Sequence, residues 1–246
     1  MRLRCVRRNG RRRGLWRIGV WWAVGFRMAR LILQGPYLGD TLAMGQGFLA
    51  LYNVTGDRAE LKKAEAAAGF IAANFAPVSR GTGFVTSRTA TDAAYRPHPD
   101  RDENIALVRF ASMLAFATGD ERFRAMAAEA MRYLAAEQVA LAPLSAGILL
   151  ANQDATADPL HVTVLGAAGD RAAMALHAAA LRSIASHELI EARDPSDRSP
   201  LPSKVTYPRL NRPALFLCTE RACSSPVFQA DEVRGKIQRA ELQAAR

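Results

Sequence analysis

Hydrophobic residues between positions 40 and 134 recur every three or four residues, the spacing that places side chains on one face of an α-helix. This spacing occurs in two blocks, residues 40–75 and 103–134, and the sequence Thr-Gly-Asp interrupts each block once. The corresponding positions are Met44, Gly47, Phe48, Leu51 and Thr55 with Leu107, Phe110, Ala111, Leu114 and Thr118, and Leu61, Ala64, Ala68 and Ile71 with Phe123, Met126, Ala130 and Tyr133. The pattern predicts a helical hairpin that occurs at least twice.

The Thr-Gly-Asp breaks contain the residues that end one helix and begin the next. Gly56 and Gly119 are suited to the left-handed conformation that ends a helix. Asp57 and Asp120 are placed to accept hydrogen bonds from free N–H groups of the following helix. Glu60 lies three residues after Asp57 and predicts a capping box with it.

The remaining segments predict shorter elements. The connection 77–100 contains a Gly-Thr-Gly-Phe-Val-Thr-Ser run that predicts a short β excursion, and residues 143–152 predict one more short helix. Three segments beyond residue 158 have strand composition, and helices are predicted between and after them. The strands are expected at 160–165, 187–192 and 214–218, and the helices at 171–183 and from about 230. The sequence therefore predicts a mainly α protein, with a helical-hairpin domain at 36–152 and a small α/β module at 158–246.

The positive charge of the chain is concentrated at its start. The formal net charge is +10, yet residues 1–35 carry 10 of the 33 basic residues, and no acidic residue precedes Asp40. Residues 36–246 hold 23 basic and 23 acidic residues, so this part has no net charge with which to attract nucleic acid. We therefore expect no nucleic-acid partner.

The sequence of the basic leader, residues 1–35, does not predict a membrane anchor. Arg17 interrupts its apolar run from Leu15 to Phe26, and a spanning helix needs roughly 20 apolar residues. We expect a disordered start, or one that is not part of the fold, on a cytoplasmic protein. The alternative is an interfacial helix that carries the three tryptophans of the leader.

Several segments in order carry a resemblance to a known family: Tyr37-Leu-Gly-Asp40, Gly83-Phe84, Asp102-Glu-Asn104, His161-Val-Thr-Val-Leu-Gly166, Leu201-Pro-Ser-Lys-Val205 and Cys218-Thr-Glu-Arg-Ala-Cys223-Ser-Ser-Pro226. Roughly from residue 37 to residue 233, the chain resembles the C-terminal half of the thioredoxin-domain-containing proteins related to the spermatogenesis-associated thioredoxin-like protein. The resemblance implies that the hairpins belong to an (α/α)₆ toroid, similar to N-acylglucosamine 2-epimerases and six-hairpin glycosidases.

The chain departs from this family pattern in two respects. It has no Cys-x-x-Cys pair, so no thioredoxin domain is expected, and only two hairpins are recognisable, so the (α/α) toroid is expected to be partial. We expect the C-terminal portion of a longer protein. A protein partner, or self-association, is expected to cover the open hairpin faces.

The resemblance also implies that the helical domain binds or processes a carbohydrate. Hydrolysis of a glycosidic bond uses two carboxyl groups. Asp40 and Glu103 occupy equivalent repeat positions, so we expect them at one end of neighbouring helices as a catalytic pair. The substrate-binding candidates are Tyr37, Phe84, His98, Asp102 and Asn104. The alternative is that the acidic residues cap helix N-termini and that the aromatic rings are core, which leaves open whether the chain is an enzyme.

Cys218 and Cys223 are candidates for a redox site. Four residues separate them, which is too many for a thioredoxin-type pair, and two thiols alone do not satisfy a tetrahedral zinc ion. One interpretation is a reversible disulfide in the loop after the third strand, and the other is two small buried residues in a reducing cytoplasm. The four histidines show no metal-ligand spacing, so we expect no metal and no cofactor.

Overall fold

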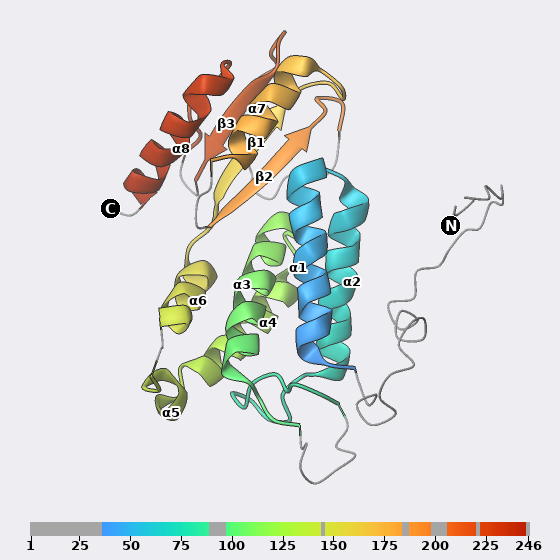
Figure 1. Ribbon diagram of the computed structural model, residues 1–246, viewed down its shortest axis with the longest axis vertical. Helices are drawn as coiled ribbons and strands as arrows, with labels where there is room; N and C mark the ends of the chain where they lie inside the picture. The colour runs from blue at the N-terminus through green and yellow to red at the C-terminus, as the bar shows by residue number, and fades with distance from the viewer. Residues whose placement is uncertain are drawn as a thin grey trace, which may run out of the picture. The chain divides into compact units, whose positions relative to one another are not determined.

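The computed structural model describes residues 36–88, 97–143, 146–183, 187–197, 206–219 and 222–244 (Figure 1). The basic leader 1–35, residues 89–96 of the connection and the motif at 201–205 lie outside these residues. The described part is mostly helical and contains a small mixed sheet of three strands. None of its helices combines the length and the apolar composition that crossing a membrane requires.

Both predicted hairpins are confirmed. The first consists of α1 (Leu38–Thr55) and α2 (Arg58–Asn74), and the second of α3 (Arg101–Thr118) and α4 (Glu121–Leu134). Figure 1 shows α1 and α3 side by side, and the two helices are in contact. Two further helices follow, the single turn α5 (Glu137–Ala140), which the sequence analysis did not predict, and α6 (Ala146–Thr156), which packs on α3 and α4.

The breaks within the hairpins have the predicted backbone geometry. Gly56 and Gly119 both end a helix in the left-handed region, with φ values of 69° and 70°. The side chains of Asp57 and Asp120 each accept the N–H two residues further along the chain, at 2.8 and 2.9 Å. These acceptors satisfy N–H groups that the first turn of a helix otherwise leaves free.

The predicted capping box is wrong. The N–H of Asp57 donates to the hydroxyl oxygen of Thr55 at 3.2 Å, so it is already satisfied from within the break. The carboxylate of Glu60 instead pairs with the ammonium group of Lys63 at 2.6 Å.

The equivalent helices α1 and α3 bury different faces. Leu107 and Leu114 of α3 are fully buried in the core that the two hairpins share. Their repeat equivalents on α1, Met44 and Leu51, are 52 % and 48 % exposed. The described residues thus cover this face on α3 but leave it about half exposed on α1. The repeat thus predicts the helices correctly but not which of their faces are buried.

The connection between the hairpins makes the short β contacts that the sequence predicts. Tyr37 forms an antiparallel bridge with Ser87. The N–H of Leu38 donates to the carbonyl oxygen of Thr86, and the N–H of Thr86 donates to the carbonyl oxygen of His98, both at 2.9 Å. These bonds tie the start of α1 to the segment that leads into α3.

The predicted α/β module is present. Its strands are β1 (Leu160–Leu165), β2 (Glu188–Arg193) and β3 (Ala214–Cys218), in the order β2-β1-β3. β1 pairs in parallel with β2 and antiparallel with β3. The helix α7 (Arg171–Leu181) connects the parallel strands, and α8 (Ala230–Ala244) follows the third.

The sheet has one apolar and one partly polar face. Val162, Val164 and Leu215 belong to the apolar face, which packs against α7 and α8. The opposite face carries polar side chains of β1 and β2, and α1 contacts it through β2. Residues 34–246 therefore form one compact unit. A toroid of hairpins is not confirmed, since the described residues contain two hairpins.

The two glycine breaks provide a matched test of this packing. Gly56→Ala and Gly119→Ala both place a methyl group on a left-handed residue, which costs about 1–2 kcal/mol. At Gly119 the added carbon meets open space, but at Gly56 it lies 2.9 Å from the backbone oxygen of Ala192 on β2. We expect Gly56→Ala to lower the free energy of unfolding by about 1 kcal/mol or more beyond Gly119→Ala, measured by urea denaturation. Equal losses would contradict the close contact between the first break and β2.

Candidate functional site

The two predicted catalytic carboxylates lie at the same end of the hairpins. Asp40 is in the first turn of α1 and Glu103 is in the first turn of α3. Burial raises the pKa of Glu103, and the negative charges of Asp100 and Asp40 raise it further. Asp40 itself is exposed to solvent. The repeat thus correctly places the two groups within electrostatic reach of each other.

The carboxyl group of Glu103 is only partly satisfied by the protein. It accepts a hydrogen bond from the backbone of Gly39, at the N-terminus of α1. Its other oxygen, Oε2, is buried and has no hydrogen-bond partner. A carboxyl group with a raised pKa keeps its proton to a higher pH than an ordinary glutamate, which is the property required of a general acid.

Helix capping explains part of this cluster, but through a different residue from those predicted. The side chain of Asp100 accepts the N–H of Glu103 at 2.9 Å and so caps α3. Asp102, a predicted substrate-binding residue, has a side chain that is 81 % exposed and lies 3.4 Å from Arg101. Glu103 caps the neighbouring helix α1 through Gly39 and not its own helix.

Two other predicted substrate-binding residues are structural. Asn104 is fully buried, and its side-chain amide bonds to both the N–H and the carbonyl oxygen of Phe84 at 2.9 Å. Phe84 is only 4 % exposed, because its ring lies in the core. The expectation that this ring stacks on a sugar therefore does not fit the structure. Tyr37 is half-buried and His98 is exposed, so both reach the surface, and His98 lies close enough to Glu103 to act on its charge.

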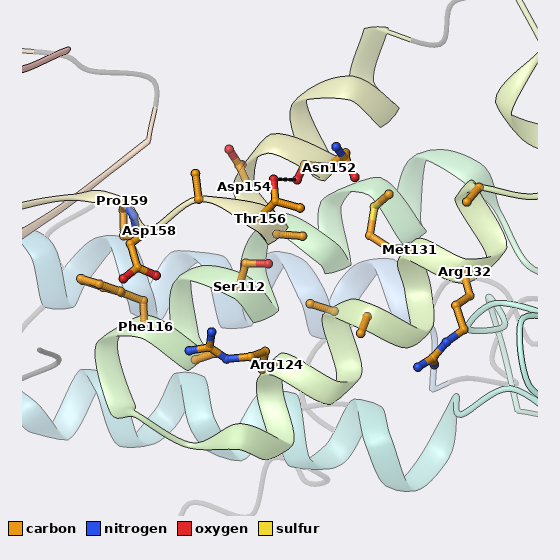
Figure 2. A pocket seen from close by; sticks show the side chains of 16 residues that line it. Ser112, Phe116, Arg124, Met131, Arg132, Asn152, Asp154, Thr156, Asp158 and Pro159 are labelled. Carbon is orange, nitrogen blue, oxygen red and sulfur yellow. Dashed lines mark hydrogen bonds between the residues drawn. The ribbon is translucent and has the colours of Figure 1, made fainter. Parts of the chain in front are cut away.

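A groove of about 430 Å³ lies elsewhere, between α3, α4, α6 and the segment that leads to β1 (Figure 2). Its wall is mainly apolar and includes Phe116 and several alanines. Charged groups in this wall have partners within the protein: Arg124 lies 3.3 Å from Glu121, and Asp154 lies 2.6 Å from Arg109. No predicted site residue lines this groove.

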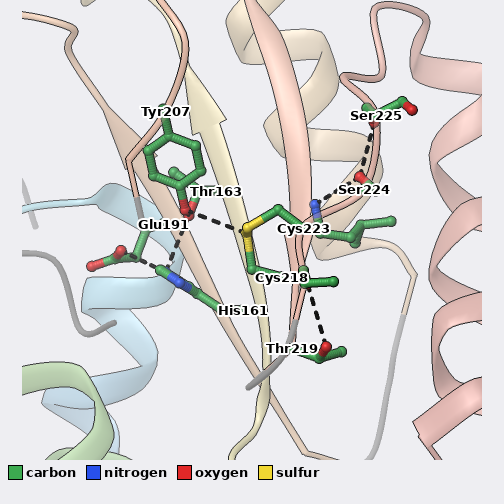
Figure 3. The surroundings of a disulfide bond; sticks show 11 residues. His161, Thr163, Glu191, Tyr207, Cys218, Thr219, Cys223, Ser224 and Ser225 are labelled. Atoms are coloured by element: carbon green, nitrogen blue, oxygen red, sulfur yellow. Dashed lines mark hydrogen bonds and ion pairs between the residues drawn. A yellow bond between two sulfur atoms is a disulfide. The ribbon is translucent and has the colours of Figure 1, made fainter. Parts of the chain in front are cut away.

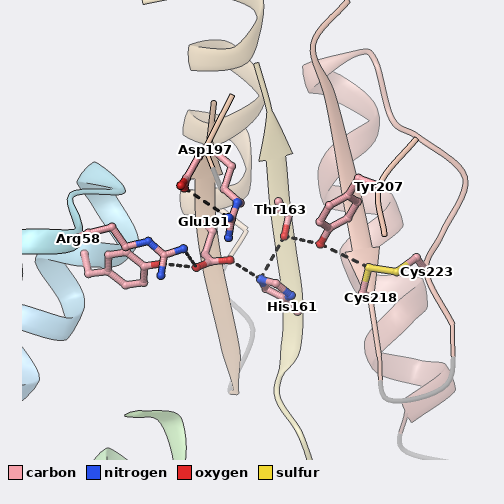
Figure 4. Close-up of polar contacts among 10 residues, drawn as sticks. Arg58, His161, Thr163, Glu191, Asp197, Tyr207, Cys218 and Cys223 are labelled. Carbon is pink, nitrogen blue, oxygen red and sulfur yellow. Dashed lines mark hydrogen bonds and ion pairs between the residues drawn. A yellow bond between two sulfur atoms is a disulfide. The ribbon is translucent and has the colours of Figure 1, made fainter. Parts of the chain in front are cut away.

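A row of buried polar side chains crosses the sheet face that meets the hairpins (Figure 4). The Nε2 atom of His161 on β1 lies 2.7 Å from a carboxylate oxygen of Glu191 on β2. The other oxygen of Glu191 accepts a hydrogen bond from the hydroxyl of Tyr52 on α1, and Arg58 of α2 lies 3.7 Å from it. Glu191 and His161 are each 1 % exposed.

The ionisation of Glu191 is controlled by these neighbours. Burial alone would raise the pKa of this carboxyl group, but its hydrogen bonds to His161 and Tyr52, with the charge of Arg58, outweigh burial and lower the pKa. The same burial and the charge of Glu191 raise the pKa of the Tyr52 hydroxyl. Tyr52 therefore remains a proton donor to an ionised carboxylate.

The row continues to the cysteines (Figure 3). The hydroxyl oxygen of Thr163 lies 3.1 Å from Nε2 of His161 and accepts a hydrogen bond of 2.8 Å from the hydroxyl of Tyr207. The hydroxyl oxygen of Tyr207 lies 3.9 Å from Sγ of Cys218. Cys218 and Cys223 form a disulfide bond. The interpretation as two buried cysteines without a bond is therefore wrong, and Cys223 is exposed.

The sequence analysis named His161 only as part of the family resemblance, and it did not single out Tyr52, Thr163, Glu191 or Tyr207 as functional residues. One signal was available. His161 and Thr163, and likewise Glu191 and Arg193, alternate within strands, so each pair lies on one face of the sheet. Polar residues at alternate positions of a strand that is otherwise apolar indicate a second packed face with polar chemistry. Among the described residues, no group of three or more His, Cys, Asp or Glu side chains is placed to hold a metal ion.

Glu103→Gln tests whether the negative charge of Glu103 lowers the free energy of unfolding. Its pKa in the folded protein is raised above the ordinary 4.5, so this carboxyl group binds its proton more tightly when folded. The corresponding stability is present below pH 4.5 and is lost as the pH rises through the raised pKa. Glutamine avoids this loss, so we expect Glu103→Gln to raise the free energy of unfolding at pH 7, by less than about 1 kcal/mol because the group is partly exposed.

Urea denaturation at pH 7 and pH 4 measures this effect, and the gain should vanish at pH 4. Glu121→Gln is the matched control, because Glu121 lies in the first turn of α4 with an exposed side chain. A loss of stability in Glu103→Gln at pH 7 would identify Glu103 as a helix cap alone.

Comparison of the chain with protein-family models and with curated protein sequences gives no match. The functional argument therefore depends on the geometry of the two polar groups, one around Glu103 and one between Glu191 and Cys218.

Proposed function

We propose that the chain is the C-terminal portion of a protein of the thioredoxin-domain-containing family, and that it binds or processes a carbohydrate at the end of the hairpins around Glu103. The observation that carries the proposal is the carboxyl group of Glu103, with its raised pKa and its unpartnered Oε2 atom near a second carboxylate, Asp40. The resemblance to six-hairpin glycosidases supports the choice of a sugar as ligand. The proposed location is the cytoplasm.

The proposed roles follow from the environments of the two carboxyl groups. Glu103, whose pKa is raised, is the group that donates a proton to the oxygen of the glycosidic bond as that bond breaks. Asp40 is the exposed carboxylate and acts on the sugar or on an attacking water. Tyr37 and His98 reach the surface, where the ring of Tyr37 stacks on the sugar and the imidazole of His98, which acts on the charge of Glu103, binds a hydroxyl.

A panel of oligosaccharides tests the proposal. Thermal shift and calorimetry measure binding to the full chain, and release of reducing sugar measures hydrolysis. We expect Glu103→Gln and Asp40→Asn to retain binding but to lower the hydrolysis rate at least about a hundredfold, because each removes a proton-transfer or charged group. Asp120→Asn is the control, since asparagine preserves the cap at the break of the second hairpin. Failure of every sugar to bind the wild-type protein would refute the proposal.

A second function is favoured by the exposed apolar face of α1. Met44, Leu51 and Val54 are each about half exposed on this helix, and Gly47 lies among them with open space around it. The equivalent residues of α3, Leu107 and Leu114, are fully buried in the core, so this surface has the composition of a buried helix face. We propose that a second copy of the chain packs its α1 against it, since glycine allows two helix backbones to approach closely.

Light scattering after size-exclusion chromatography tests this association. We expect the wild-type protein to be a dimer and Leu51→Glu to be a monomer, because a charge in a helix contact loses its hydration. Leu149→Glu is the matched control, because Leu149 lies on α6 with 71 % of its surface exposed. A monomeric wild-type protein would exclude this second function.

A further inference from the structure

We propose that Cys218 and Cys223 form a redox-active pair that exchanges with thiols, and that Tyr207 stabilises the thiolate of Cys218 when the disulfide opens. This inference lies beyond the proposed sugar site and does not depend on it. It concerns the end of β3, on the α/β module.

The two sulfur-bearing residues differ in their access to solvent. Cys218 is the last residue of β3 and is 1 % exposed, whereas Cys223 is exposed on the returning segment. An incoming thiolate therefore reaches the sulfur of Cys223 and not that of Cys218. Attack on one sulfur of a disulfide expels the other, so Cys218 is the leaving group.

The surrounding backbone holds the two cysteines opposite each other independently of the sulfur–sulfur bond. Cys218 and Cys223 form an antiparallel bridge. Hydrogen bonds flank the pair on both sides: the N–H of Thr219 donates to the carbonyl oxygen of Ala222 at 2.9 Å, and the N–H of Ser224 donates to that of Leu217 at 2.7 Å. The pair is thus a non-hydrogen-bonded position of the ladder, where opposing side chains approach most closely. Opening the disulfide therefore leaves the thiols in register for closure.

The loop that the disulfide closes is short, so the bond contributes little to the stability of the fold. A cross-link stabilises a protein mainly by restricting the unfolded chain, and this effect grows with the length of the closed loop. Cys223 follows Cys218 by only five positions, with four residues between them. The disulfide therefore adds little to the free energy of unfolding. The module is stabilised mainly by apolar contacts among β1, β3, α7 and α8.

A buried thiolate needs a hydrogen-bond donor, because burial otherwise disfavours the charged form. Tyr207 supplies one, with its hydroxyl oxygen 3.9 Å from Sγ of Cys218 (Figure 3). In the disulfide form this hydroxyl donates to Thr163 at 2.8 Å. When Cys218 becomes a thiolate, rotation of the same O–H toward the sulfur replaces a neutral hydrogen bond by a stronger, charge-assisted one.

The groups around Tyr207 keep it in its donor form. Burial raises the pKa of its hydroxyl, as does the negative charge of Glu191, while the hydrogen bond to Thr163 and the charge of Arg193 lower it. The net effect raises the pKa, so the phenol holds its proton at neutral pH. His161 lies opposite Cys218 in the register of β1 and β3. The other titratable groups along this row are Tyr52 and Arg58, which contact Glu191, and Asp197, which pairs with Arg193.

The exchange conserves atoms and electrons with a thiol as reductant. A thiolate attacks Sγ of Cys223, the bond to Cys218 breaks, and Cys218 leaves with the electron pair as a thiolate. A second thiolate then attacks the reductant sulfur in the mixed disulfide, which releases Cys223 as a thiolate and forms the oxidised reductant. Two electrons pass to the cysteine pair, and the protons of the two reductant thiols go to solvent or to the cysteine thiolates.

The first experiment uses the full chain with Cys5→Ser, so that Cys218 and Cys223 are the remaining cysteines. The protein is equilibrated in buffers of reduced and oxidised glutathione at pH 7, alkylated and weighed by mass spectrometry, with near-ultraviolet circular dichroism recorded in parallel. We expect complete and reversible conversion between disulfide and dithiol forms without loss of the native spectrum. A disulfide that glutathione opens only together with unfolding would overturn the redox role and leave a structural bond.

The second experiment tests Tyr207 through the thiolate of Cys218. In a chain with Cys5→Ser and Cys223→Ser, the ultraviolet absorbance of the thiolate is followed against pH. Tyr207→Phe keeps the ring, whose centroid lies 5.1 Å from that of Phe216, and removes only the hydroxyl. We expect the thiolate fraction at pH 7 to fall about tenfold, the effect of one hydrogen bond to a charged group.

Tyr133→Phe is the matched control, because the hydroxyl of Tyr133 bonds to the carbonyl oxygen of Pro99 at the far end of α3. It should leave the titration unchanged. An unchanged titration in Tyr207→Phe would overturn the role of Tyr207, and the glutathione experiment would still decide the role of the cysteine pair.

Discussion

The carboxylate of Glu191 connects the helical hairpins to the sheet, and the arrangement of both depends on it. It lies fully buried between His161, Tyr52 and Arg58, which come from β1, α1 and α2. Removing one partner of a buried charge pair costs roughly 3–5 kcal/mol, a large share of the 5–15 kcal/mol that stabilises a typical domain. The buried negative charge of Glu191 is tolerated because each of its carboxylate oxygens has a hydrogen-bond partner, His161 for one and Tyr52 for the other. The first hairpin and the sheet are therefore held in one relative position by a polar contact and not by apolar packing alone.

This contact explains why the sheet has two unlike faces. Its apolar face packs against α7 and α8, and these apolar contacts require no particular hydrogen-bond partners. The opposite face buries hydroxyl, imidazole and carboxylate groups, which are linked by a continuous row of hydrogen bonds from Glu191 to Tyr207. The disulfide lies at the end of that row. A negative charge on Cys218 would therefore change the hydrogen bonds of Tyr207 and Thr163.

The candidate sugar site and the exposed face of α1 both arise from the repeat. Repetition of the hairpin places the first turns of α1 and α3 together, which brings Glu103 near Asp40 and lets it accept the N–H of Gly39. The same repetition gives α1 and α3 similar apolar residues, yet Leu107 and Leu114 of α3 are buried, whereas their equivalents on α1, Met44 and Leu51, are about half exposed. A residue pattern suited to a central helix therefore remains exposed on α1.

The sequence by itself determined the strands, all the helices except the single turn α5, and the breaks between them. Local rules suffice there, because a three-to-four spacing, a glycine at positive φ and an aspartate cap act within a few residues, and β1 and β3 fall at their predicted positions. The proximity of Asp40 and Glu103 also followed from the repeat. Only the tertiary structure decided that Phe84 and Asn104 are buried, that Asp100 caps α3, and that Cys218 and Cys223 are bonded. The row from Tyr52 to Tyr207 likewise joins residues far apart in the chain. Burial and hydrogen bonding between distant segments depend on how elements pack, and the spacing of residues within one element does not contain that information.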